Sequence, residues 1–224
     1  MNGLLAAIVD DDRMRVDALL AGHVDLVGRL IDKPKLYESS IFHWIYVGDT
    51  ALHLAAAGYR VEIVQRLLAA GADPNSAKSH RRGSPFHYAA DGFISHPSWD
   101  PARQVETLRV LLAAGADLHA QDQNGATALH RAVRTRCAAA ALYLLSVGAD
   151  PTRRNKPGST AFHLAVQNTG RGGSGEGIAK EAQREIVEGF KSFGVSTELK
   201  NGKGQSVVDC ARSAWVRDIL TSHR

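Results

Sequence analysis

Four histidines recur at similar intervals along the chain and are the first residues whose type and spacing could carry chemistry. His53, His87, His130 and His163 are separated by 34, 43 and 33 residues. Neutral imidazole is a common zinc ligand, so an aligned set of histidines could form a series of metal sites. However, the ligands of one metal must converge within a few ångströms, whereas equivalent atoms of stacked helices lie about a helix diameter apart. The spacing therefore favours a structural role, and no metal site is expected.

A group of arginines is the second candidate for chemistry. Arg134, Arg136 and Arg171 could line a pocket together with Trp99. Such a pocket would take an anion or a carboxylate, because a guanidinium group binds both through paired hydrogen bonds. The same residues allow a plainer interpretation, in which Trp99 packs on its own loop and the arginines pair with carboxylates such as Asp91. Both interpretations stay open at this point.

Catalysis would need a reactive side chain beside a base, or a metal. Cys137 lies near Arg134 and Arg136, which could lower the pKa of its thiol, but no base can be assigned to it. The glycine-rich run at 170–175 (GRGGSG) lacks the Lys-Ser/Thr ending of a phosphate-binding loop and follows no predicted strand. We therefore expect no catalytic residues, no nucleotide site and no cofactor.

The histidines stand within four related segments, each of which opens an apolar helix. The segments are GDTALHLAA (48–56), GSPFHYAA (83–90), GATALHRAV (125–133) and GSTAFHLAV (158–166). A Thr or Ser three residues before each histidine can cap the first amides of that helix. A second apolar helix follows, and three of these end in Leu-Leu-x-x-Gly-Ala-Asp, where the glycine suits a helix C-cap. The pattern predicts helix pairs that bury their apolar faces only by stacking on one another.

These segments resemble the ankyrin repeat, whose signature is G-x-T-P-L-H-x-A-A followed by L-L-x-x-G-A-D. The resemblance runs from about Tyr46 to Leu220, and recurrence in register makes it specific. It implies an all-α helical solenoid, built of stacked helix–turn–helix units with short β-hairpin or loop fingers. It also implies that the four histidines hydrogen-bond loop backbone between neighbouring repeats.

The repeat pattern divides the chain into four repeats between two caps. The expected boundaries are 1–40 (N-terminal helical cap), 41–79 (repeat 1), 80–121 (repeat 2), 122–154 (repeat 3), 155–200 (repeat 4) and 201–224 (C-terminal capping repeat). Terminal repeats need a polar outer face, which accounts for the degenerate motifs at both ends.

Two insertions interrupt the repeats between their inner and outer helices. One occupies 91–101 in repeat 2, and a glycine-rich one occupies 168–179 in repeat 4. Both are expected on the same edge of the solenoid, on either side of repeat 3. The arginine pocket described above would lie between them.

The resemblance implies a non-catalytic protein–protein interaction scaffold that binds a partner through the concave face of fingers and inner helices. Trp44 and Tyr46 make the first finger rich in aromatic side chains, which are typical binding anchors but could equally pack over the N-terminal cap. The candidate contacts are Trp44, Tyr46, Asp49, Asp91, Asn124, Arg131, Arg134 and Gln167. The alternative is a small-molecule or anion-binding protein, with or without enzymatic activity, that uses the pocket between the insertions. The sequence does not name the protein partner.

Composition limits the remaining classes of function. The formal net charge is +4, and Lys and Arg are spread along the whole chain, which disfavours nucleic-acid binding because such proteins concentrate charge on one face. No run of 18 apolar residues could span a membrane, and the N-terminus lacks the basic region of a secretory signal. Only two cysteines occur, Cys137 and Cys210, far apart in the sequence. We expect a monomeric cytoplasmic protein with reduced thiols and no membrane partner.

Overall fold

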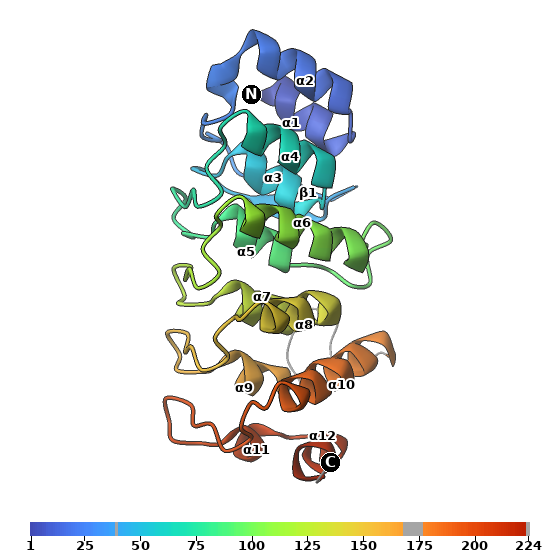
Figure 1. The fold of residues 1–224 in the computed structure, drawn as a ribbon, viewed down its shortest axis with the longest axis vertical. Coiled ribbons are helices and arrows are strands. Elements are labelled where there is room, and N and C mark those ends of the chain that lie inside the picture. Colours follow the sequence, from blue (N-terminus) through green and yellow to red (C-terminus); the bar gives the residue numbers. More distant parts are fainter. Residues whose placement is uncertain (39, 168–176, 223–224) are drawn as a thin grey trace.

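Helix pairs stacked in two rows make up the solenoid (Figure 1). The computed structural model describes residues 1–38, 40–167 and 177–222. The inner row consists of α1 (Asn2–Val9), α3 (Ala51–Ala57), α5 (Pro85–Ala90), α7 (Ala128–Arg134), α9 (Ala161–Ala165) and α11 (Val207–Cys210). The outer row consists of α2 (Arg13–Gly22), α4 (Val61–Ala69), α6 (Pro101–Ala113), α8 (Ala138–Ser146), α10 (Gly177–Ser192) and α12 (Ala214–Thr221). Consecutive helices of each row pack on one another, which confirms the predicted all-α solenoid.

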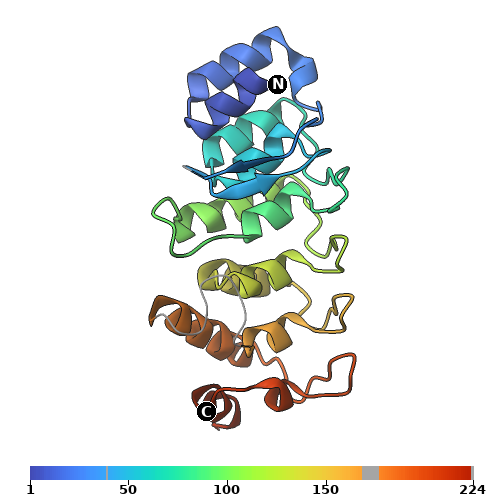
Figure 2. The same ribbon diagram turned by 180° about the vertical axis from the view of Figure 1, so that it is seen from behind.

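The remaining elements lie near the N-terminal end. A short 3-10 helix, η1 (Val24–Leu26), follows α2, and the strands β1 (Lys35–Tyr37) and β2 (His43–Ile45) form a hairpin. Figure 1 faces the outer row of helices, whereas Figure 2 shows the inner row with the hairpin in front of it. The loops between successive repeats project to one side in both views, and we call these loops fingers.

The core lies between the two rows and is shared by neighbouring repeats. Ala55 on α3 is fully buried, as are its equivalents Ala89, Ala132 and Ala165 on the next three inner helices. A side chain this small lets successive inner helices approach closely. Each repeat thus buries its apolar surface against the next one, and the stability of the array is a property of neighbours rather than of single helix pairs.

The four histidines tie each repeat to the following finger. Their Nε2 atoms lie 3.1 Å from the carbonyl oxygens of Gly83, Ala126, Ser159 and Gln205, which belong to the four successive fingers (partners of His53, His87, His130 and His163 in that order). The structural role implied by the resemblance is therefore confirmed.

The other ring nitrogen fixes the protonation state of these histidines. Nδ1 of His53 accepts the backbone N–H of Thr50 at 3.0 Å, and Nδ1 of His87 accepts that of Ser84 at 3.2 Å. A nitrogen that accepts a hydrogen bond carries no proton, so the proton sits on Nε2 and is donated to the finger carbonyl. Burial also lowers the pKa of all four histidines, to about 4 for His87. The imidazoles are neutral links.

The finger before the first repeat segment (48–56) begins earlier than its sequence indicates. Leu36 pairs with Trp44 across the antiparallel hairpin, and the ladder continues where the N–H of Ile31 donates to the carbonyl of Asp49 at 2.8 Å. Residues expected in the N-terminal cap therefore form half of the hairpin. A strand of three residues is too short to show an alternating pattern, so no sequence signal marked it.

The insertion in repeat 2 connects α5 to α6 and packs against the hairpin. The ring of Phe93 in the insertion stacks on Phe42 with centroids 4.9 Å apart, and His96 lies 5.0 Å from the same ring. In repeat 4, residues 177–179 of the expected insertion are the first residues of α10, and 168–176 lie outside the described residues.

These neutral links make the stability of the fold dependent on pH. A histidine with a pKa near 4 in the folded state and about 6.5 in the unfolded state stabilises the protein fully above pH 6.5, and this contribution is lost as the pH falls toward 4. We expect the thermal midpoint to fall by several degrees between pH 7.5 and pH 5. His87→Gln should lower the midpoint at pH 7.5 but make its pH dependence shallower. A wild-type midpoint that is constant over this range would contradict neutral links.

Candidate functional site

A cup opens on the inner face where the hairpin, two fingers and α7 meet. Its volume is ≈ 290 Å³. We call it the inner-face cup and define it by its lining residues His43, Trp44, Tyr46, Arg81, Tyr88, Asp91, Asp122, Asn124, Arg131, Arg134 and Thr135. Six of these were predicted as partner contacts: Trp44, Tyr46, Asp91, Asn124, Arg131 and Arg134. Its lining residues come from repeats 1, 2 and 3.

Aromatic rings and one guanidinium group form the wall on the hairpin side. Trp44 on β2 has 42% of its surface exposed, a high value for so large an apolar side chain. Its ring stacks on Tyr46 at 6.3 Å, and the Arg81 guanidinium lies over the Tyr46 ring at 4.9 Å. The cation–π contact holds Arg81 beside the aromatic wall.

Buried charges form the floor of the cup. Nη2 of Arg131 lies 2.8 Å from Oδ2 of Asp122, and Nη1 lies 3.2 Å from Oδ2 of Asp91. Arg134, at the C-terminal end of α7, reaches Oδ1 of Asp91 at 3.2 Å. His43 from β2 lies 3.7 Å from Asp91, so the carboxylate is surrounded by three nitrogen-bearing side chains.

The electrostatics of this floor keep Asp91 ionised. Burial alone would raise the pKa of its carboxyl group, but the contacts with His43, Arg131 and Arg134 outweigh burial and hold the pKa well below its usual range. The pKa of Asp122 is lowered as well, since the favourable charge and hydrogen bonds of Arg131 outweigh its burial. A buried arginine between two carboxylates is a structural arrangement, because each charge is matched by a partner.

Three predicted partner contacts, Asp49, Asp91 and Arg131, have side chains that are mostly buried. Asp91 and Arg131 are 9% and 8% exposed and pair with each other in the floor. Asp49 is fully buried, and its Oδ2 accepts hydrogen bonds from the Tyr88 hydroxyl at 2.6 Å and the Tyr46 N–H at 2.8 Å. Charged residues at family contact positions have become internal here, because each meets a partner from the adjacent repeat.

The eighth predicted contact, Gln167, lies at the end of α9 and does not line the cup. It is half-buried, and its backbone carbonyl accepts a hydrogen bond from Arg136 at 2.6 Å. The candidate contacts thus separate into a cup between repeats 1 and 3 and a residue farther along the inner row.

The predicted arginine pocket between the insertions is not formed by its described residues. Arg136 is 1% exposed, and its guanidinium donates to the carbonyls of Ala165 and Gln167. Trp99 donates its indole N–H to Gln104 at 3.1 Å, which fastens it to its own repeat. Arg134 belongs to the inner-face cup, and Arg171 lies outside the described residues. The plainer interpretation holds for Trp99, whereas Arg136 pairs with backbone rather than with carboxylates.

Arg136 belongs to a recurring device that supports the insertions. In repeat 1 a tight turn lets the N–H of Arg60 donate to the carbonyl of Ala55. The insertion removes this turn in repeat 2, and the side chain of Gln104 donates instead to the equivalent carbonyl, that of Ala89, at 3.0 Å. Gln183 does the same for Ala165 in repeat 4, at 2.7 Å. Buried helix-end carbonyls need such partners.

The repeats without insertions add a second hydrogen-bond donor to the helix-end carbonyls of the repeat that follows them. Tyr59 in repeat 1 and Arg136 in repeat 3 occupy the same turn position with φ of 53° and 63°. Tyr59 donates its hydroxyl to the carbonyl of Asp91 in repeat 2 at 2.6 Å, as Arg136 donates to carbonyls of repeat 4. Sequence reasoning missed this role of the four side chains, although Tyr59 and Arg136 stand at one repeat position, and Gln104 and Gln183 at another.

The structure gives no support to a reactive cysteine. Cys137 is fully buried beside Gly92, where an added Cβ would lie 2.6 Å from its sulfur. Burial raises the pKa of its thiol to about 11. The neighbouring guanidinium of Arg136 turns away to the carbonyls of the next repeat, so the lowered pKa considered from the sequence is wrong.

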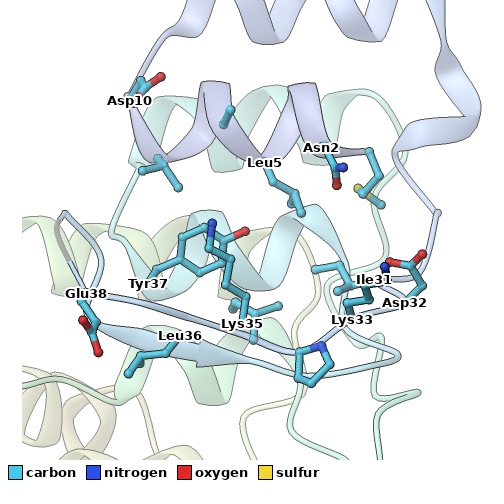
Figure 3. Close-up of a pocket in the computed structure, with 15 residues that line it drawn as sticks. Asn2, Leu5, Asp10, Ile31, Asp32, Lys33, Lys35, Leu36, Tyr37 and Glu38 are labelled. Carbon is cyan, nitrogen blue, oxygen red and sulfur yellow. The ribbon is translucent and has the colours of Figure 1, made fainter.

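A second, larger cavity of ≈ 690 Å³ lies between α1 and β1 (Figure 3). Lys35 and Tyr37 rise from β1 toward α1, with the Lys35 ammonium 4.8 Å from the Tyr37 ring. Asp10, Asp32 and Glu38 line this cavity together with Lys33 and Lys35, so its charges are mixed and select no ligand class.

The described residues offer neither a metal site nor a membrane span. Within the described part of the chain, no three His, Cys, Asp or Glu side chains are grouped so that they could hold a metal ion. None of the helices in those residues is both long and apolar enough to cross a bilayer.

The charged floor leads to a test of stability. Arg131→Met should lower the free energy of unfolding by about 3–5 kcal/mol, because it leaves two carboxylates buried without their shared partner. Arg109→Met removes an exposed pair with Glu106 on α6 and should cost less than about 1 kcal/mol. Urea denaturation measures both. Equal losses of unfolding free energy from the two substitutions would show that the buried ion pairs of the floor stabilise the fold no more than an exposed pair does.

Comparisons with known proteins agree with this architecture. Models of the ankyrin repeat match residues 47–79 and, as a set of ankyrin repeats in three copies, residues 101–191. The chain is 29% identical over 161 residues to the nuclear factor NF-kappa-B p105 subunit of Gallus gallus, a match covering 58% of this chain and 16% of that protein. Its fold is similar to the crystal structure of an ankyrin repeat domain from Acinetobacter baumannii, with a TM-score of 0.67, 25% identity, and coverage of 97% of this chain and 93% of that one. With the repeat motifs, the stacked helix pairs and the histidine links in place, the chain belongs to the ankyrin repeat family.

Proposed function

We propose that the chain is a non-catalytic protein-binding scaffold that holds its partner on the face formed by the fingers and inner helices. Ankyrin repeats generally mediate protein–protein interactions. The choice of face rests on the inner-face cup, where a tryptophan with 42% of its surface exposed lies beside polar side chains. Large aromatic side chains with polar neighbours are the usual anchors of protein interfaces.

The placement of Trp44 supports a binding role over a packing role. The sequence left open whether the aromatic finger packs over the N-terminal cap. Ile45 takes that internal position, being 1% exposed, whereas Trp44 and Val47 remain 42% and 49% exposed on the same finger. Exposed apolar side chains that cluster beside a concavity mark interaction sites more often than isolated ones do.

The chemistry of the titratable groups supports a non-catalytic role. The four aligned histidines are buried, neutral and bound on both ring nitrogens to their own and the next repeat. The thiol of Cys137 is buried with a raised pKa. General acid–base or nucleophilic catalysis needs a group that is both accessible and suitably ionised. A monomeric state and a cytoplasmic location stay part of the proposal, the latter supported by two unpaired thiols.

Site-specific photo-cross-linking tests the binding face. A photoreactive amino acid replaces Trp44 or Asn124 in separate variants, and in matched controls it replaces Gln65 on α4 or Ala139 on α8, which are exposed on the outer row. In lysate of the source cells we expect the same discrete protein adduct from both inner-face positions and none from the outer row. Adducts that form only from the outer row, or equally from all four positions, would overturn the proposed face.

A further inference from the structure

We infer that the inner-face cup receives a carboxylate from an acidic segment of the partner protein. The inference rests on the proposed function and adds the chemistry of the partner. Its basis is the state of the charges around the cup: those in the floor are already matched, whereas a guanidinium group at the rim is not.

Arg81 is the unmatched group. Its guanidinium lies over the Tyr46 ring, and Nη2 is 3.4 Å from the Tyr46 hydroxyl. Among the described residues, no carboxylate lies within ion-pair distance of Arg81, and its buried Nε has no hydrogen-bond partner. The backbone carbonyl of Arg81 accepts the N–H of Gln123 at 2.9 Å, which fixes the base of the side chain to the next finger. A held guanidinium without a counter-charge is a preorganised carboxylate receptor.

Arg134, the last residue of α7, also lines the cup. Its side chain is 56% exposed, and one of its nitrogens contacts Asp91. That carboxylate is also bound by Arg131, so Arg134 is not its sole counter-ion and keeps donors free for a ligand. Asn124, exposed on the finger that precedes α7, adds an amide to the lining of the cup. The rim therefore offers donors to an anion while the buried carboxylates remain neutralised.

The size of the cup favours a side chain over a free small molecule. Its volume of ≈ 290 Å³ lies at the lower limit of pockets that enclose small ligands, which are about 300–1,000 Å³. A carboxylate carried by a larger partner needs only the rim of the cup, and the stacked rings of Trp44 and Tyr46 offer apolar surface to the neighbouring residues of the same segment.

The neighbouring fingers extend the positive charge beyond the cup. Exposed basic residues outnumber acidic ones in the fingers at 70–84, 147–160 and 193–206; they include Lys78, Arg82, Lys156 and Lys203. Two of the three acidic residues of these fingers are paired, Asp150 with Arg153 and Glu198 with Lys200. A partner that spans several fingers therefore meets a surface of positive potential, which is complementary to an acidic segment.

The distribution of these charges favours protein over nucleic acid. The finger at 114–127 separates the basic fingers; its only acidic residues are Asp117 and Asp122, and it has no Lys or Arg. A phosphate backbone needs a continuous basic track, because its affinity comes from many successive phosphate contacts. A protein segment can place its acidic residues where the basic groups stand and its neutral residues between them.

A displayed library of random peptides tests the inference with the whole chain as bait. We expect peptides enriched in Asp and Glu, with about tenfold weaker binding to Arg81→Gln and a smaller loss with Arg134→Gln. Arg109→Gln on α6 removes the same charge from the outer row and should leave binding unchanged. Thermal midpoints of all variants confirm that they are folded, and Arg81→Lys should retain part of the affinity.

The outcomes separate this inference from the proposed function. Selected peptides without an excess of acidic residues that still cross-link to Trp44 would overturn the acidic chemistry alone. A library that yields no binder, together with absent cross-links at the inner face, would overturn both. A single-stranded oligonucleotide that binds more tightly than the peptides, and depends equally on Arg81, would assign the surface to nucleic acid and overturn the inference.

Discussion

The hydrogen bond from each buried imidazole to the carbonyl of the next finger is the interaction on which this structure depends. It joins the start of an inner helix to a loop some thirty to forty residues away, so a finger is held in place by the preceding repeat. Without that link the fingers would be ordinary exposed loops. With it, Arg81 and Asn124 stand at fixed distances from the hairpin, and a cup can exist between elements that are remote in sequence.

A neutral histidine suits this position for a reason that extends beyond geometry. One nitrogen accepts from the cap of its own helix and the other donates to the next repeat, so protonation would place two donors against each other at the cap. The same requirement removes these histidines from metal binding and from acid–base chemistry. The four histidines, which first looked capable of chemistry, are held in structural hydrogen bonds by both ring nitrogens.

The sequence predicts the repeating part of the molecule well because that part repeats. The segments around His53, His87, His130 and His163 align with each other, and their caps and buried alanines follow from a common pattern. The burial of Asp49, Asp91 and Arg131 could not be predicted, because Tyr88 bonds Asp49 and Arg131 bonds Asp91 across repeats, and no local pattern indicates that Arg131 meets two carboxylates. The strand at Lys35–Tyr37 and the role of the Arg81 side chain could not be predicted for the same reason. Each acquires its role only through contact with a distant segment.

The insertions show how function and stability divide within this chain. The regular turn satisfies the helix-end carbonyls with backbone, whereas the repeats with insertions use buried glutamines and a side chain from the repeat above. These side chains hold the inserted repeats in register and leave the arginine pocket expected between the insertions unformed. The inner face, bounded by the hairpin and the first fingers, presents the exposed ring of Trp44 and the guanidinium of Arg81.

Hydrogen–deuterium exchange of the chain, alone and with the partner recovered by cross-linking, tests most directly the claim that this inner face is the binding surface. When the partner is bound, we expect added protection from exchange at 43–47, 78–84 and 122–126, and unchanged exchange on the exposed faces of α4, α6 and α8. Protection confined to the outer helices, with no change in the hairpin and the first two fingers, would contradict it.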